Sequence, residues 1–114
     1  MGNFTKDRVI LLKYKSGTAA AVPAYDRYTL ENVMVRELFG TDAESVNAGG
    51  AVVYVLRDVS VCRGPSGAVT ELPRLAKGDR CVLHAGTEAE VSMRVTEAGY
   101  FNGESLAHVR IRLK

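Results

Sequence analysis

Apolar residues occur along the chain in short runs, separated by glycine, proline, asparagine and aspartate. Arg8 to Tyr14 is rich in valine, isoleucine and leucine and ends at Ser16-Gly17, which predicts a first strand. Ala51 to Val59 holds a continuous β-branched and aromatic run, so we expect a strand that is buried on both faces. A turn at Lys77-Gly78-Asp79 leads into a further short strand, Arg80 to His84.

The segments between these strands are less regular. Tyr28 to Leu38 spaces its apolar residues as a strand with a bulge or kink would. Thr18 to Asp26 consists of small residues interrupted by Pro23, which predicts a loop. A helix-capping pattern begins at Thr41, yet Gly49-Gly50 follows within two turns, so at most one short helical turn fits there.

Two alternating runs lie near the end of the chain. Val91 to Glu97 has strict period two and predicts a strand, although a helix from Thr87 competes because glutamate, alanine and methionine favour helices. Ser105 to Lys114 alternates apolar with basic side chains, which is typical of a half-buried strand with a basic outer face. Asn102-Gly103 between them predicts a hairpin.

The register of this hairpin depends on its loop. A two-residue loop would set Val95 opposite Arg110 and is rejected, because it places an apolar face against a basic one. A three-residue loop, Phe101 to Gly103 with Gly103 in a bulge, matches the apolar faces. The predicted cross-strand pairs are Val95 with Val109, Met93 with Ile111 and Val91 with Leu113.

The pattern as a whole predicts an all-β fold, a small β-barrel or sandwich of about six short antiparallel strands with long loops. A length of 114 residues fits one domain, 1–114, and 46% apolar with 25% charged residues is an ordinary globular composition. The longest apolar runs are far shorter than the roughly 18 residues of a membrane span. Met1 to Lys6 is polar and offers no signal peptide, so we expect neither membrane contact nor export.

Residues that could carry catalysis or bind metal do not converge. Cys81 and His84 are three apart, a spacing that points side chains to opposite faces of a strand, and no second cysteine or histidine pair exists. Cys62 and Cys81 are expected to be buried, reduced, apolar side chains. Acidic residues are scattered singly and no phosphate-binding glycine loop occurs. We therefore expect no enzyme, metal or cofactor.

Basic residues give a softer signal. Arg110, Arg112 and Lys114 share one strand face, and Arg94 on the partner strand lies beside them, so this face could contact phosphates. A solvated face, or charges that protect a sheet edge from aggregation, is the favoured reading. The net charge of +2 is small, and no aromatic platform is expected on that face.

Three long loops point to an interaction protein. Gly17 to Asp26, Gly40 to Gly50 and Arg63 to Gly78 are predicted to lack regular structure. Loops of this length in a small domain usually serve binding or become ordered in an assembly.

An ordered set of segments supports a family resemblance. They are an opening strand ending in Lys13-Tyr14, then Tyr28 to Val35 with Leu30-Glu31-Asn32-Val33, then Leu75 to Asp79 before Arg80 to Leu83, and finally Met93-Arg94-Val95 followed after a turn by Gly103 to Ile111. In this order the chain resembles, from about Val9 to Lys114, the small minor capsid or head-tail connector proteins of tailed phages and prophages, a group that includes head-completion and stopper proteins.

The resemblance implies a β-barrel protomer that assembles as a ring in the neck of the virion, between portal and tail, after synthesis in the bacterial host cytoplasm. Such a ring would seal or gate the channel for double-stranded DNA and would contact itself, portal or adaptor proteins and tail proteins. It implies no catalytic residue or cofactor. Arg94, Arg110, Arg112 and Lys114 would contact DNA or the channel. We expect subunit contacts from loop residues: Tyr25, Arg27, Arg63, Arg74 and Lys77.

The alternative function is a free-standing small β-barrel that binds nucleic acid through the basic face of its C-terminal strand.

Overall fold

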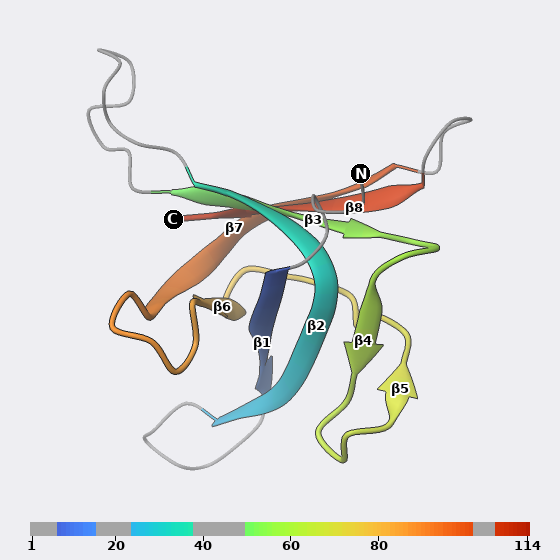
Figure 1. Ribbon diagram of the computed structural model, residues 1–114, viewed down its shortest axis with the longest axis horizontal. Coiled ribbons are helices and arrows are strands. Elements are labelled where there is room, and N and C mark those ends of the chain that lie inside the picture. Colours follow the sequence, from blue (N-terminus) through green and yellow to red (C-terminus); the bar gives the residue numbers. More distant parts are fainter. Residues whose placement is uncertain (1–6, 16–23, 38–49, 102–106) are drawn as a thin grey trace.

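The computed structural model describes residues 7–15, 24–37, 50–101 and 107–114. This part of the chain is built of antiparallel strands (Figure 1), which confirms the predicted all-β fold class. No helix long and apolar enough to cross a membrane occurs in these ranges. The strands are β1 Asp7–Lys15, β2 Ala24–Glu37, β3 Ala51–Leu56, β4 Val61–Arg63, β5 Val69–Thr70, β6 Arg80–Leu83, β7 Val91–Phe101 and β8 His108–Leu113.

Six of the strands close into a barrel. Their pairings run β1–β2–β3–β8–β7–β6 and return from β6 to β1. β4 and β5 form a hairpin outside this ring, joined to it where β4 pairs with β2. In Figure 1, β3, β7 and β8 cross the top of the molecule and β1 descends below them. The barrel wall consists of two sheets, one in the order β2–β1–β6–β7 and the other in the order β2–β3–β8–β7. The long strands β2 and β7 belong to both sheets and carry the chain from one to the other.

β2 bends at a bulge on Asn32. This residue has a φ of 57° and is the extra residue opposite the β1 step from Asp7 to Arg8. Asparagine adopts this left-handed conformation more readily than most residues because its short polar side chain bonds locally. The Ser60 hydroxyl donates to the Asn32 carbonyl at 2.6 Å and accepts from the Leu56 amide at 2.9 Å. The predicted bulge or kink in this segment is confirmed.

The bulge explains why the third predicted strand is shorter than expected. β3 ends at Leu56, because the chain turns over residues 57–60. It continues as β4, which pairs with β2 from Thr29 to Glu31 on the other side of the bulge. The predicted burial on both faces holds for Ala51, Val52 and Val53, while the last three residues of β3 are half-buried. The loop predicted for Thr18 to Asp26 is wrong from Ala24 on, since β2 begins there. The part of this predicted loop before Ala24 lies outside the described residues, as does the helical turn predicted after Thr41.

The hairpin of β7 and β8 exists, but its predicted register is wrong. Val95 lies opposite Leu113 and not Val109, and the ladder continues to Phe101 opposite His108. The register shifts between Val95 and Glu97, so the residues that face the core change phase there. Strict period two, on which the prediction relied, therefore fails in the middle of β7. Phe101 belongs to the strand, and the predicted turn residues 102–103 lie outside the described part of the chain.

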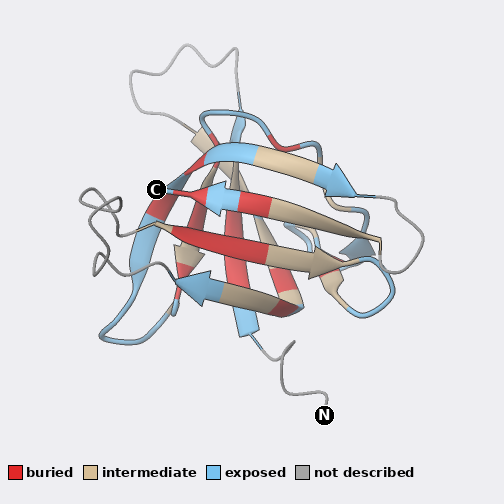
Figure 2. Cartoon of the chain, turned by 90° about the horizontal axis from the view of Figure 1, so that it is seen from above, coloured by how far each residue is buried: buried red, intermediate tan, exposed pale blue. Residues whose placement is uncertain are grey.

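The barrel interior is apolar and receives side chains from every strand of the ring. The largest fully buried apolar side chains are Leu11, Leu30, Leu83, Ile111, Val9, Val33 and Val53. Figure 2 shows the sheet of β2, β3, β8 and β7 from outside, with the buried residues of β3 and β8 gathered toward the end of the sheet where β3 begins and β8 ends. At about 25 cal/mol per Å² of apolar surface removed from water, this burial is the main source of stability for the fold.

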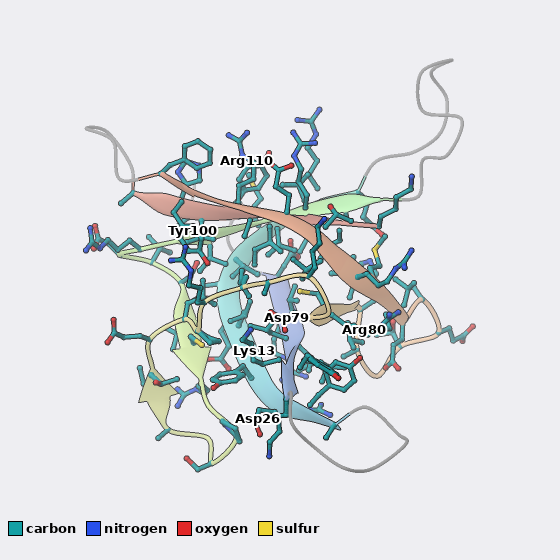
Figure 3. The ribbon with its side chains drawn as sticks, turned by 180° about the vertical axis from the view of Figure 1, so that it is seen from behind. Lys13, Asp26, Asp79, Arg80, Tyr100 and Arg110 are labelled. Atoms are coloured by element: carbon teal, nitrogen blue, oxygen red, sulfur yellow. The ribbon has the colours of Figure 1, made fainter. Side chains whose placement is uncertain are left out.

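One charged side chain, Asp79, is buried among the described residues, with 1% of its surface exposed. Its carboxylate accepts from the backbone amides of Tyr14 at 2.8 Å and Ala76 at 2.9 Å, and from Lys13 Nζ at 2.9 Å. The Asp79 amide donates to the Ala76 carbonyl, and Gly78 between them has a φ of 103°. The backbone hydrogen bond confirms the predicted turn before β6. The contacts of the Asp79 carboxylate with Lys13 and Tyr14 join this turn to β1 (Figure 3).

Candidate functional site

The candidate site is the outer surface of the four-stranded sheet formed by β2, β3, β8 and β7. In β8 the side chains of Val109, Ile111 and Leu113 turn toward the core, so the alternate residues turn outward. Figure 3 shows Arg110 pointing away from the body of the barrel. We call this surface the basic face. It consists of Arg36, Arg94, Arg110, Arg112 and Lys114 with the rings of Tyr54, Phe101 and His108.

The four basic residues predicted from the sequence lie on the adjacent strands β7 and β8 or, for Lys114, directly after β8. Arg110 and Arg112 alternate along β8. Arg94 on β7 lies opposite Lys114, and two backbone hydrogen bonds of 3.0 and 2.9 Å join them. The structure thus brings the four residues to one surface; their contact with nucleic acid stays a prediction.

A fifth cation, Arg36 on β2, was not found from the sequence. Arg36 pairs in register with Val52, which pairs on its other side with Arg112. Val52 is only 6% exposed although it faces outward. The aliphatic stems of the flanking arginines are the groups placed to cover it, as long basic side chains commonly do.

Aromatic rings lie among these cations, contrary to the expectation of no aromatic platform. The guanidinium of Arg110 is 5.6 Å from the ring centre of Tyr54 and 4.8 Å from that of Phe101. Phe101 and His108 stack with ring centres 4.9 Å apart and an angle of 15° between their planes. The expectation was wrong because the predicted hairpin placed Phe101 in its loop and because Tyr54 comes from β3, on the other side of β8.

The rings hold Arg110 in place. Cation–π contacts are worth about 0.5–1 kcal/mol at exposed sites, and two act on the same guanidinium. Arg110 Nε is buried and has no hydrogen-bond partner within the described ranges. Within the described residues, the contacts of the Arg110 guanidinium are with the Tyr54 and Phe101 rings.

Positive charge exceeds negative charge on the basic face. None of its five cations forms an ion pair with a carboxylate in the described part of the chain, and Glu97, opposite Arg112 in the ladder, is not within ion-pair distance of it. Elsewhere on the barrel, basic side chains do pair, as Lys15 does with Asp26 and Arg63 with Glu31. The small net charge therefore conceals a local excess of positive charge, which attracts anions.

The residues predicted to make subunit contacts do not all lie in loops, which corrects that prediction. Tyr25 and Arg27 belong to β2, and Arg63 ends β4. Arg63 also donates to Glu31 and to the Gly67 carbonyl. Arg74 lies over the Tyr100 ring at 5.6 Å, and Lys77 is exposed in the turn before β6. The predicted loop from Arg63 to Gly78 contains β5, and subunit contact by these residues stays a prediction.

A pocket of about 510 Å³ opens between the four-stranded sheet and the β4–β5 hairpin. Val55, Leu72 and Val109 form apolar parts of its wall, and Cys62 also lines it. Burial raises the pKa of the Cys62 thiol, so the group is protonated at neutral pH and is a poor nucleophile or metal ligand. Within the described residues no group of three or more histidine, cysteine or acidic side chains is arranged to hold a metal.

The second cysteine, Cys81, is fully buried in β6, as expected for an apolar side chain. Burial, with the Asp79 carboxylate adding to its effect, raises the pKa of the Cys81 thiol to about 12. The unfolded chain ionises the same thiol near its ordinary value of 9.0, so the unfolded state loses this proton first as the pH rises. The stability that this thiol contributes is therefore complete below pH 9 and is lost as the pH rises toward 12.

The effect can be measured by urea unfolding of the wild type and of Cys81→Ala at about pH 8 and about pH 10. Alanine removes packing at both pH values but removes the titrating thiol as well. We expect the difference in free energy of unfolding between the two proteins to shrink at the higher pH. A difference that stays constant would show that the Cys81 thiol ionises as readily in the folded chain as in the unfolded one.

Comparison of the chain with models of protein families, with curated proteins and with solved structures finds no match.

Proposed function

We propose that this protein is a structural component of the head-tail neck of a tailed phage, in which copies of the chain form a ring between portal and tail. The ring seals or gates the DNA channel by packing and contact, without catalysis, and the basic face is the surface that meets DNA. Its partners are further copies of the chain, portal or adaptor proteins, tail proteins and the double-stranded DNA in the channel.

The observation that carries the DNA contact is the gathering of five cations on one sheet face, none of which forms an ion pair within the described residues. Such a surface binds the phosphates of DNA, and the release of counterions from the DNA contributes affinity that does not depend on base sequence. A channel surface has the same requirement, since DNA of any sequence must pass it. The phage setting itself rests on the ordered segments that resemble connector proteins, and a small closed barrel is compatible with such a protomer.

The test of the phage setting is the virion. Particles of the phage or prophage that encodes the chain are purified and imaged, and the purified protein is mixed with portal complexes. We expect the protein in the particle, as a ring at the neck, and bound to portal complexes in solution. Particles that lack the chain would overturn the proposal.

A free-standing nucleic-acid-binding barrel is the second candidate, and the rings beside Arg110 favour it. Aromatic side chains interleaved with basic ones are common in proteins that bind single strands. This candidate predicts salt-dependent DNA binding by a chain that is absent from particles, whereas the neck protein predicts presence in them.

A further inference from the structure

We infer that the end of the basic face that carries Tyr54, Phe101, His108 and Arg110 is a stacking site for unpaired nucleotides. This inference rests on the proposed contact between the basic face and nucleic acid. It goes further by naming the form of nucleic acid that this end prefers, a single strand.

The rings come from three adjacent strands of one sheet. Tyr54 lies on β3, Arg110 and His108 on β8, and Phe101 on β7. A four-stranded sheet whose outward aromatic side chains stack two or three bases is a known way of holding single-stranded nucleic acid. Every base offers a flat π-surface, so stacking of this kind tolerates any sequence.

The spacing of the rings suits a short run of stacked bases. Tyr54 and Phe101 are separated by the width of β8, which is two inter-strand spacings or about 10 Å. Bases in a stacked strand follow one another at about 3.4 Å, so about three of them cover this distance. Arg110 lies between the two rings, where its planar guanidinium can stack on a base or donate to a phosphate.

On the basic face, the part suited to bases and the part suited to phosphates lie at different ends. The cations that carry no ring contact lie toward the other end of the sheet, with Arg112 and Arg36 on either side of Val52 and Arg94 opposite Lys114. A strand whose bases stack on the rings would lead its backbone toward these charges. The arrangement joins a π-surface to a positively charged track, the two parts that single-strand binders combine.

A duplex would contact the basic residues of this surface but not its aromatic rings. Its bases are stacked on each other and paired, so their flat faces are closed to the rings. The basic residues could still contact its phosphates, but Tyr54 and Phe101 would add nothing to that contact. The rings should therefore distinguish a single strand from a duplex.

Gly99 provides the space that Phe101 occupies. Gly99 lies opposite Arg110 in the ladder. A Cβ atom on Gly99 would stand 2.9 Å from Phe101 Cε2, closer than such atoms approach each other, so the ring would have to move. The glycine thus keeps the Phe101 ring against the sheet and next to the Arg110 guanidinium, 4.8 Å away.

The inference is tested by fluorescence anisotropy with dye-labelled oligothymidylate of about 12 nucleotides and with a duplex of the same length. The variant is the double substitution Tyr54→Leu and Phe101→Leu, which keeps apolar cover on the sheet and removes both rings. The matched control is Tyr14→Leu, which removes an aromatic side chain of similar exposure (43%) from β1, outside the basic face. Thermal melting of each variant shows whether it is folded.

We expect the wild type to bind the single strand at least about tenfold more tightly than the duplex. The double variant should lose at least about tenfold in single-strand affinity and change its duplex affinity by less than about twofold, while Tyr14→Leu changes neither. A folded double variant with unchanged single-strand affinity would overturn the stacking site and leave the phosphate contact standing. A wild type that binds neither probe at low salt would overturn the stacking site and the proposed DNA contact together.

If the double variant fails to fold, Gly99→Ala replaces it. This substitution removes no ring and no charge but displaces Phe101. We expect single-strand affinity to fall and duplex affinity to stay within about twofold of the wild type. Equal affinities of Gly99→Ala and the wild type for the single strand would count against the stacking site.

Discussion

Asp79→Ala is expected to lower the free energy of unfolding by about 3–5 kcal/mol, the range measured when one partner of a buried ion pair is removed. The substitution leaves Lys13 Nζ without its carboxylate and two backbone amides, of Tyr14 and Ala76, without an acceptor. Small domains have about 5–15 kcal/mol of stability in total, so the loss is a large part of it. Urea unfolding followed by circular dichroism measures the change.

The matched control is Asp26→Ala, which breaks the exposed ion pair of Asp26 with Lys15 at 3.6 Å. Exposed pairs contribute about 0–1 kcal/mol, so this variant should unfold near the wild-type midpoint. Asp79→Asn gives an intermediate case, because an amide oxygen can still accept one hydrogen bond but carries no charge. Equal stabilities for Asp79→Ala and Asp26→Ala would show that the buried carboxylate does not hold the turn against β1.

The double substitution Arg110→Glu and Arg112→Glu is expected to weaken DNA binding at low salt by at least about a hundredfold, because it removes two phosphate contacts and adds repulsion. The same variant should flatten the dependence of the logarithm of affinity on the logarithm of salt concentration. Both side chains point outward from β8, so the fold should be kept. Anisotropy titrations at several salt concentrations provide the measurement.

The control for this variant is Arg8→Glu with Arg27→Glu, both exposed on the β1–β2 hairpin. Each replacement removes one positive and adds one negative charge, so both double variants take the formal net charge from +2 to −2. We expect the control to lose less than about fivefold in affinity, since its charges lie away from the basic face. Similar losses for the two variants would mean that DNA responds to net charge and not to this surface.

The strands themselves could be predicted well from the sequence, because each is a short run with strong β-branched or alternating character. Arg8 to Tyr14 was expected and Asp7–Lys15 is found; Arg80 to His84 was expected and Arg80–Leu83 is found. The bulge in the second strand could also be predicted, since the apolar spacing there fits neither period cleanly. These are local properties, which a single segment of sequence determines.

Register could not be predicted by the same means. β8 alternates so evenly that several registers bury its apolar residues equally well, and a bulge near Val95 lets β7 change phase without cost to the core. Val91, which was expected on the apolar face, is 40% exposed. Only the closed ring of pairings, which depends on strands far away in sequence, selects one of these registers.

The basic face was predictable only in part for the same reason. Alternation in β8 revealed Arg110 and Arg112, because both lie on one strand. Tyr54 and Arg36 belong to β3 and β2, and nothing local to either strand says that β3 lies beside β8. Asp79 was read as a turn residue, and its burial follows from contact with Lys13, which is 66 residues away in the sequence.

Closure of the barrel also fixes the order in which the protein can become stable during its synthesis. β1 and β2 are synthesised before the other strands and are partners in the barrel, but the other edge of β1 pairs with β6, which is made later. The gap between β3 and β7 is filled by β8, the last strand of the ring. Two of the six ring pairings, β1–β6 and β3–β8, join segments that are distant in the sequence, and pairings of this kind slow folding. The nascent chain therefore carries open strand edges until β8, the last of the six ring strands in sequence order, has been made and can close the barrel.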